Sequence, residues 1–296
     1  MELSIKLKEI SNKVTFRQIG LSILSFKVLI LFYFAYLLIT QFTSKEFTFD
    51  ESFYIFLVVG FLAQMIDGAL GMAYGIICST LLLTFGIPAA VASASVHTSE
   101  VFTTGISGLS HIKLKNIDKK LFFQLVITGV VGAVAGSYLI SGLFDGDTIK
   151  PYVSAYLLIM GIYVIYKGIK NKEEQPKVDK KVPALAFAGG FLDAIGGGGW
   201  GPIVTSNLLS KGYNPAKTIG TVNTAEFFIT FFSTITFIFF LGVTHWQVIL
   251  GLVAGGAVAA PMGAYFATKA NKKLLMILVG CVIILTSAYS IAKFLI

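Results

Sequence analysis

The sequence predicts an all-α polytopic membrane protein made of two inverted repeats, with one extra helix in front of them. Of the 296 residues, 55% are hydrophobic and only 13% are charged, which is too few charges for a water-soluble chain of this size. Long apolar runs without regular alternation recur along the chain, as expected of membrane-spanning helices and not of a membrane β-barrel. A polar run near position 100 returns near position 226, which indicates a duplicated fold.

The repeated polar run defines the two halves. Residues 95–104 read SVHTSEVFTT and residues 221–230 read TVNTAEFFIT, so six of the ten pairs are identical or differ by one methyl group. Glu100 is thereby paired with Glu226, and His97 with Asn223. A duplicated polar stripe in an apolar chain is typical of transporters whose binding site lies between two related halves.

The first 51 residues lie outside both repeats. Residues 1–17 carry four basic side chains and no apolar core followed by a cleavage site, which predicts a cytoplasmic N-terminus and no secretory signal. The extra span is expected at 22–42, where Lys27 can reach the membrane interface with its long side chain. The loop at 45–51 has three acidic residues and one lysine, which places it outside.

The first repeat is expected at 52–169, and its opening apolar stretch is too long for one span. Residues 53–86 contain Gly68, Gly71 and Gly75, so we expect two short helices, 53–66 and 72–85, that enter and leave the membrane on the same side. Spans follow at 89–108, 121–140 and 152–166. The lysine-rich loop at 110–120 then lies inside and the acidic loop at 143–150 outside.

A hydrophilic linker at 170–182, expected in the cytoplasm, leads to the second repeat at 183–296. One short helix is expected to end near 195 and another near 210, separated by a glycine-rich break. Spans follow at 216–241, 246–268 and 274–295, with a lysine-rich cytoplasmic loop at 268–273. Because each repeat has an odd number of full crossings, the two halves are predicted to be inverted.

The glycine-rich break at 196–202 reads GGGGWGP. Each glycine costs a helix about 1 kcal/mol relative to alanine, and irregular backbone at membrane depth survives only inside protein or beside a wet cavity. The helix that restarts there would offer its N-terminus to an anion. Isolated glycines have the alternative role of letting helices pack closely.

A short match aligns the two breaks with each other. The tripeptide Gly-Phe-Leu at 60–62 recurs at 190–192, and this offset pairs Gly68 with Gly198 and Gly71 with Gly201. On that alignment Asp67 corresponds to Gly197 and not to Asp193. We expect Asp67 and Asp193 to cap the short helices, because a carboxylate in contact with substrate would repel an anion.

Polar side chains in the repeated run are the remaining candidates for the site. Glu100, Glu226 and His97 are candidate proton-coupling residues, since intramembrane ionisable groups usually mark a functional site. The alternative is that each Glu caps a broken helix or bonds a nearby hydroxyl, and that His97 is a satisfied hydrogen-bonding residue. The candidate substrate-binding residues are Gly68, Gly71, Ser95, Thr98, Gly197, Gly198, Gly199, Gly201, Thr221, Asn223 and Thr224.

Several other classes of function are disfavoured. The net charge of +8 resides in loop lysines, with a single arginine, so no nucleic-acid surface is expected. Cys78 and Cys281 lie in apolar segments, where packed thiols are expected and not a disulfide. No metal-ligand spacing, catalytic constellation or cofactor motif is present, so an enzyme is not expected.

The glycine-rich segments at 60–75 and 189–202, and the polar helices that follow them, resemble the sulfite exporter TauE/SafE family, also called the toluene sulfonate uptake permease family. The later Gly136-Ser137-Tyr138 and Gly263-Ala264-Tyr265 segments fit as well. The resemblance covers roughly residues 53–295. It implies secondary transport of small sulfur-containing anions such as sulfite, thiosulfate, sulfoacetate and related organosulfonates.

We therefore expect a multi-pass protein of the cytoplasmic (inner) membrane that moves a small anion between its two repeats, with protons as a candidate coupling ion. A passive anion channel, or a transporter of another small carboxylate or oxyanion, is the alternative. The identity of the anion, the direction of transport and the presence of a homodimer stay open.

Overall fold

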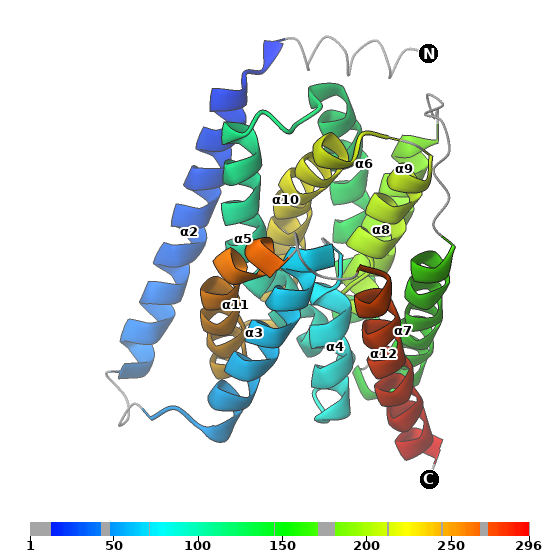
Figure 1. Cartoon of the computed structure of the whole chain (residues 1–296). Helices are drawn as coiled ribbons and strands as arrows, with labels where there is room; N and C mark the ends of the chain where they lie inside the picture. Colours follow the sequence, from blue (N-terminus) through cyan, green and yellow to red (C-terminus); the bar gives the residue numbers. More distant parts are fainter. Residues whose placement is uncertain are drawn as a thin grey trace.

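The chain forms a bundle of helices, shown as a computed structural model in Figure 1. The structure describes residues 13–42, 48–70, 72–144, 146–170, 181–211, 213–243, 245–266 and 272–295. These residues contain α- and π-helices and no strand. In chain order they are α2 (Phe16–Phe42), α3 (Glu51–Leu70), α4 (Tyr74–Thr84), α5 (Ala89–Lys113), α6 (Lys119–Tyr138), η1 (Leu139–Leu143), α7 (Gly146–Ile169), α8 (Val182–Gly196), η2 (Gly201–Thr205), α9 (Ser206–Ser210), α10 (Pro215–Leu241), α11 (Trp246–Phe266) and α12 (Lys272–Leu295).

Five helical segments are long and apolar enough to cross a membrane. They confirm the helices predicted at 22–42, 121–140, 152–166, 216–241 and 274–295. Helix α5 covers the span predicted at 89–108 but is not among the five, because serine, threonine, histidine and glutamate interrupt its apolar character. The five segments are Phe16–Tyr36, Lys119–Leu143, Thr148–Ile169, Lys217–Leu241 and Met276–Phe294.

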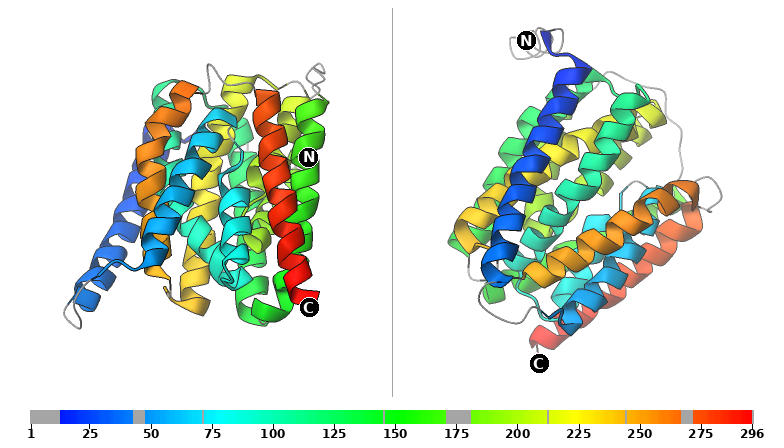
Figure 2. Two further views of the ribbon diagram at one scale, coloured as in Figure 1. Left: turned by 60° about the horizontal axis from the view of Figure 1, so that its bottom comes forward. Right: turned by 90° about the vertical axis from the view of Figure 1, so that its left-hand side faces the viewer.

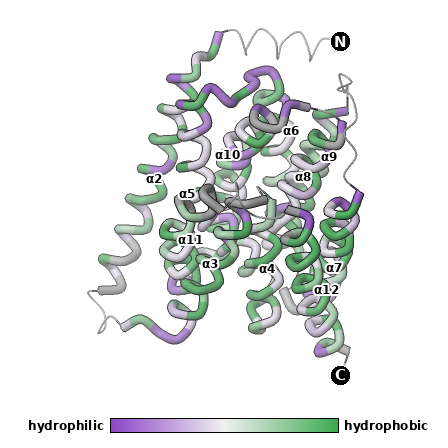
Figure 3. Tube along the Cα trace, viewed as in Figure 1, coloured by the Kyte–Doolittle hydropathy of each residue, from purple (hydrophilic) through white to green (hydrophobic). Residues whose placement is uncertain are grey.

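The outer helices present large apolar side chains to their surroundings. Phe32 of α2, Tyr152 of α7 and Leu285 of α12 are 71%, 72% and 69% exposed. Hydrophobic residues predominate along these helices, whereas hydrophilic ones gather at the loops, including the one that follows α5 (Figure 3). Such extensive apolar exposure is what a lipid-facing surface requires.

The most extensive helix–helix contacts join a helix of the first half of the chain to a helix of the second half. Helix α3 packs against α11, α6 against α8, α5 against α10 and α7 against α12. Helix α2 lies at the edge of the bundle and packs on α5 (Figure 2). The polar helices α5 and α10 are therefore neighbours in the interior.

Helix boundaries recur with a constant spacing along the chain. Helices α5 and α10 begin at Ala89 and Pro215, and α7 and α12 begin at Gly146 and Lys272, so both pairs are separated by 126 residues (215 − 89; 272 − 146). The repeated polar run has the same spacing. The Gly-Phe-Leu alignment used for the breaks was therefore wrong by four residues, because a three-residue match is too short to set a register.

The two helix breaks begin from opposite ends of the bundle. Helix α3 starts at the bottom of Figure 1 and ends near the middle, while α8 starts at the top and also ends near the middle (Figure 1). In each case a second helix, α4 or η2 with α9, returns toward the end from which its partner came.

The first break differs in detail from the prediction. Helix α3 continues through Gly68 to Leu70, and Gly75 lies inside α4, so neither glycine interrupts a helix. A single glycine costs only about 1 kcal/mol, which the packing of a helix can outweigh. Gly71 lies outside the described residues, as do most of the predicted linker and the loop at 267–271.

Other glycines let helices approach each other closely. A Cβ atom on Gly132 of α6 would collide with the backbone of Phe187 in α8, and one on Gly255 of α11 would collide with Leu57 in α3. These positions confirm the packing role expected of isolated glycines. They hold the pairs α6–α8 and α3–α11 together.

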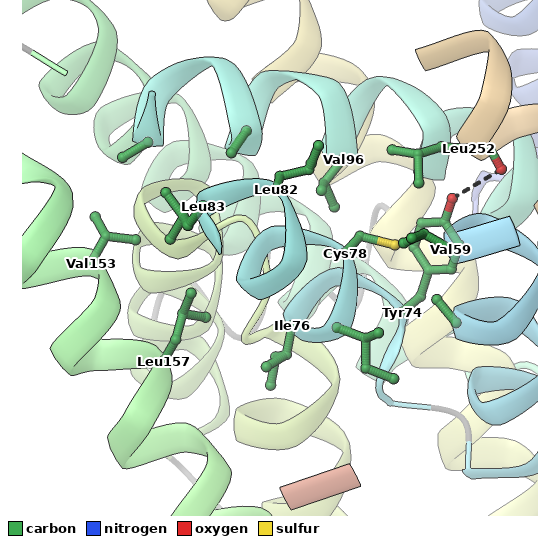
Figure 4. Close-up of a cluster of buried hydrophobic side chains, with 14 of the residues drawn as sticks. Val59, Tyr74, Ile76, Cys78, Leu82, Leu83, Val96, Val153, Leu157 and Leu252 are labelled. Carbon is green, nitrogen blue, oxygen red and sulfur yellow. Dashed lines mark hydrogen bonds between the residues drawn. The ribbon is translucent and has the colours of Figure 1, made fainter. Parts of the chain in front are cut away.

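A buried hydrophobic cluster surrounds α4 (Figure 4). Ile76, Cys78 and Leu82 of α4 are almost fully buried, and Cys78 is a free thiol as expected. Cys281 is also free but is exposed, so the expectation that it is packed was wrong. Helix α4 is thus held rigidly beside the centre of the bundle.

Candidate functional site

The two helix breaks touch each other at the centre of the bundle. A Cβ on Gly75 would lie 2.9 Å from Cα of Gly198, and a Cβ on Gly201 would lie 2.7 Å from Cα of Met72. With the spacing of 126 residues, Gly75 corresponds to Gly201, so the two contacts are equivalent. Side chains larger than hydrogen would push the two breaks apart.

The break between α8 and η2 depends on an unusual backbone conformation. Gly197 follows the last residue of α8 with a φ of 64°, in the left-handed region. Glycine adopts this conformation without the steric cost that a side chain would add. The glycine run therefore breaks the helix, as predicted.

An aspartate caps the restarting helix at each break. Oδ1 of Asp67 accepts hydrogen bonds from the N–H groups of Ala73 at 2.7 Å and Tyr74 at 3.2 Å. Oδ1 of Asp193 accepts one from the N–H of Trp200 at 2.8 Å. The expected capping role is confirmed for both. The expectation that the two do not correspond was wrong, since they are 126 residues apart (193 − 67).

A small cavity lies where the two breaks meet. Glu100 of α5 and Glu226 of α10 line it together with Asp67 and Asp193. The other lining residues are Met72, Tyr74, Gly75, Ile76, Thr103, Thr104, Gly198, Gly199, Gly201 and Pro202, so no basic side chain lines it among the described residues. The free volume is about 20 Å³, enough for about one water molecule.

Glu100 is buried at this cavity, with 5% of its surface exposed. It interacts electrostatically with Glu226, Asp67 and Asp193. Four carboxyl groups around one small cavity, two of them buried, cannot all be ionised without cations or protons to balance them. The site is thus acidic, although its two helix N-termini carry partial positive charge.

His97 lies beside the cavity and bonds to the second break. Its Nε2 is 3.1 Å from Oδ2 of Asp193, and its Nδ1 is 2.8 Å from the carbonyl oxygen of Ser93. One donor or acceptor atom from each of His97, Glu100 and Asp193 lies within 4.8 Å of the others. An imidazole grouped with two carboxyl groups can hold and pass a proton.

Ser95 and Thr98 lie away from the central cavity. They line a second cavity between α5 and α10 that also includes Phe237 and His245. The hydroxyl of Thr98 donates to the carbonyl of Ala94, one turn earlier, at 2.7 Å. These residues therefore belong to the end of the bundle where the loop after α10 lies.

Thr221, Asn223 and Thr224 are not among the residues that line the central cavity. The hydroxyl of Thr221 accepts from the N–H of Asp118 at 2.9 Å, in the loop between α5 and α6. Asn223 donates to the hydroxyl of Ser107 at 3.2 Å. Thr224 bonds its own helix at the carbonyl of Gly220.

The predicted site residues thus fall into three groups along the α5–α10 seam. Gly198, Gly199, Gly201, Glu100 and Glu226 share the central cavity, and Gly197 accepts a hydrogen bond from Ser79 just beside it. The predicted hydroxyl residues of α5 and those of α10 lie apart from that cavity, on the two sides described above. Gly68 lies within α3 near its end, and Gly71 is outside the described residues.

Two tyrosines at the centre were missed by sequence reasoning. Tyr74 donates to Ser99 at 3.1 Å and to the carbonyl of Leu252 at 3.3 Å, the contact dashed in Figure 4. Tyr156 of α7 donates to the carbonyl of Gly198 at 3.2 Å. Neither belongs to a repeated motif, so only their place in the fold connects them with the breaks.

The absence of a metal or cofactor stays a prediction.

Comparisons with known proteins agree in pointing to membrane transport. The model of the family described as sulfite exporter TauE/SafE matches residues 56–290. The probable membrane transporter protein YtnM of Bacillus subtilis (strain 168) is 47% identical over 243 residues, which are 79% of this chain and 81% of that protein. YunE, a probable membrane transporter protein of the same organism, is 25% identical over 277 residues, 81% of this chain and 100% of that protein. No solved structure matches the chain.

Proposed function

Since the chain belongs to the sulfite exporter TauE/SafE family of membrane transporters, we propose that it is a secondary transporter for a small sulfur-containing anion. It would work by alternating access in the cytoplasmic membrane, with its N-terminus in the cytoplasm. The observation that carries this proposal is the meeting of two helix breaks around a cavity lined by Glu100 and Glu226.

The two halves, 52–169 and 183–296, are proposed to be inverted repeats. The spacing of 126 residues between the starts of α5 and α10 and of α7 and α12 supports this, as does the start of α3 and α8 at opposite ends of the bundle. The packing pairs support it too, because α3–α11 is equivalent to α8–α6 under this spacing. Inverted repeats place a substrate site at their interface, near the middle of the membrane.

The anion is proposed to bind between the two breaks. The first N–H groups of a helix lack partners within that helix, and Gly75, Ile76 and Gly201 lie in the first turns of the restarted helices and line the cavity. Their N–H groups, with the positive ends of the helix dipoles, can bind an oxyanion without any basic side chain.

Proton coupling follows from the acidic lining of the same cavity. Ionised carboxylates at Glu100 and Glu226 would repel an anion, whereas protonated carboxyl groups can donate hydrogen bonds to it. We therefore propose that the anion binds together with protons on these two residues.

The present conformation is proposed to be an occluded one. A cavity of about 20 Å³ is too small for an oxyanion of several atoms, so the substrate must reach it in another conformation. The cavity that contains Ser95 and Thr98 would lead to it from one side of the membrane. The polar side chains of Thr221, Asn223 and Thr224 would lead to it from the other side.

Flux in proteoliposomes tests the proposal. Purified protein would be reconstituted and uptake of labelled sulfite, thiosulfate, sulfoacetate and taurine measured with and without an imposed pH gradient. We expect saturable uptake of at least one of these anions, and faster uptake when protons and anion move in the same direction. Uptake that neither saturates nor responds to the gradient would instead indicate a passive channel.

A further inference from the structure

The hydrogen bonds around His97 determine which ring nitrogen carries a proton. Ser93 donates its hydroxyl hydrogen to the carbonyl of Ala194 at 2.5 Å, so its oxygen atoms can only accept from the imidazole. Nδ1 of His97 lies 2.8 Å from the Ser93 carbonyl and 3.3 Å from its hydroxyl. Nδ1 therefore carries a hydrogen and donates it to Ser93.

The other ring nitrogen then requires a second proton. A neutral imidazole that is protonated at Nδ1 presents a lone pair at Nε2. Oδ2 of Asp193 is 3.1 Å from that nitrogen, and an ionised carboxylate also presents only lone pairs. Two acceptors at hydrogen-bond distance repel each other, so a proton must lie between Nε2 and Oδ2, formally on either atom.

The hydrogen bond formed by this shared proton connects α5 to the second helix break. Oδ1 of Asp193 accepts from the N–H of Trp200, where the helix restarts, while Oδ2 faces His97. Both residues are deeply buried, His97 at 0% and Asp193 at 2% exposure. Loss of the proton would leave a buried carboxylate opposite a lone pair, an arrangement that is costly at this depth.

Among the residues that the structure describes, the first break has no equivalent bond. Asp67 corresponds to Asp193, but the residue that corresponds to His97 is Asn223, which bonds to Ser107 and not to Asp67. The two halves are therefore similar in backbone and different in chemistry. The second break is tied to its neighbouring helix by a bond between two titratable groups.

We propose that the proton shared by His97 Nε2 and Asp193 Oδ2 is a coupling proton that holds the second helix break against α5. On release, the proton moves to the carboxylate of Glu100, leaving neutral His97 with its hydrogen on Nδ1, ionised Asp193 and protonated Glu100. The two facing acceptors then separate, and the break moves away from α5. This inference rests on the proposed transport function and adds a proton site to it.

The surroundings of the pair allow that transfer. Glu100, the one carboxyl group on α5, has an oxygen within 4.8 Å of a ring nitrogen of His97 and a carboxylate oxygen of Asp193. Glu226 of α10 and Asp67 of α3 face the same cavity. Tyr156 of α7 is a further titratable group beside the second break, where its hydroxyl donates to the carbonyl of Gly198.

Trp200 offers a local readout of this proton, because its backbone N–H bonds to Asp193, while its indole N–H donates to the carbonyl of Val222. The chain has two tryptophans, so Trp246→Phe leaves Trp200 as the single emitter. In lipid nanodiscs without substrate, we expect its emission to change when the pH is varied between about pH 4 and pH 9, a range that includes the ionisation of free carboxyl and imidazole groups. A flat emission over this range would overturn the proposal, whatever the flux measurements give.

Asp193→Asn is the sharpest variant. Its amide oxygen can still accept from the backbone N–H of Trp200, and its NH₂ group can donate to Nε2 of neutral His97, so the bond persists without a carboxyl proton that can be gained or lost with pH. We expect the titration of Trp200 to be lost, while His111→Gln, which alters another histidine of α5, retains it. If Asp193→Asn does not fold, His97→Gln must change the pH profile of Trp200 emission in its place, because its NH₂ group can donate to an ionised Asp193 without a shared proton. An unchanged pH profile in whichever of these variants folds contradicts the assignment.

Discussion

At the scale of single residues, the central feature is a set of four carboxyl groups around two helix N-termini. Asp67 and Asp193 neutralise the first N–H groups of the helices they cap. Glu100 and Glu226 bond to neither break, and they complete the lining of the cavity. All four line one small cavity, and Asp193 differs from the rest because it caps a helix with Oδ1 and faces His97 with Oδ2.

Glu226→Gln tests the coupling role. Glutamine keeps the size of the side chain but cannot ionise, so we expect uptake in proteoliposomes to fall by about tenfold or more, a loss of roughly 1.4 kcal/mol, with a weaker response to the pH gradient. Membrane insertion should be unchanged. The matched control is Glu51→Gln at the exposed start of α3. Equal uptake by the two variants would show that Glu226 is not part of the site.

Gly198→Leu tests the contact between the breaks. Even a Cβ at this position collides with the backbone of Gly75 and Ile76, and a leucine side chain would separate the two helix N-termini. We expect the protein to insert but to lose the stabilisation that anions give in a thermal-shift screen. Stabilisation by the same anion at the same concentration in both proteins would show that the breaks do not bind it.

At the scale of helices, close glycine contacts hold the broken helices in place. Helix α8 lies against α6 through Gly132, and α3 against α11 through Gly255. These contacts leave the ends of α3 and α8 facing each other at the centre. The breaks can be irregular because intact neighbours cover them, as irregular backbone at membrane depth requires.

Gly132→Ala is expected to weaken the α6–α8 contact. Its Cβ would collide with the backbone of Phe187, which cannot move aside as a side chain can, and overpacking typically costs about 1–3 kcal/mol. We expect a lower melting temperature in detergent. Gly20→Ala is the control, because the nearest atoms to its Cβ are side-chain carbons at 3.7 Å. Similar melting of both variants would contradict a tight α6–α8 contact.

At the scale of the whole molecule, the two halves are arranged around the α5–α10 seam. Equivalent helices meet there and at the α7–α12 contact, whereas α3 and α8 each pack on a helix of the other half. Such exchange of partners ties the halves together, so the alternating access that we propose would have to involve the breaks and the seam.

Cysteine accessibility tests the proposed topology. With Cys78 and Cys281 replaced by alanine, Lys113→Cys at the end of α5 should lie in the cytoplasm and Phe144→Cys, before α7, outside. In intact cells, a membrane-impermeant maleimide should label the second position and reach the first only after permeabilisation. The reverse labelling pattern would show that the protein has the opposite orientation in the membrane. Labelling of both positions from one side would contradict the membrane crossing predicted between them.

The sequence by itself determined the helices and their order. Hydropathy located the long helices to within a few residues, because lipid requires continuous apolar segments. The repeated polar run around Glu100 and Glu226 indicated the duplication, and four glycines before Trp200 indicated the second break. These are local signals, readable from residues that are neighbours along the chain.

Only the tertiary structure decided which polar groups share a site. The hydroxyls of Thr98 and Thr221 resembled central ligands in the sequence, yet they lie outside the central cavity, because α5 and α10 extend past its two sides. The bond between His97 and Asp193 joins residues that are far apart in the chain. No pattern along one helix reveals such a contact, since it depends on how two helices pack.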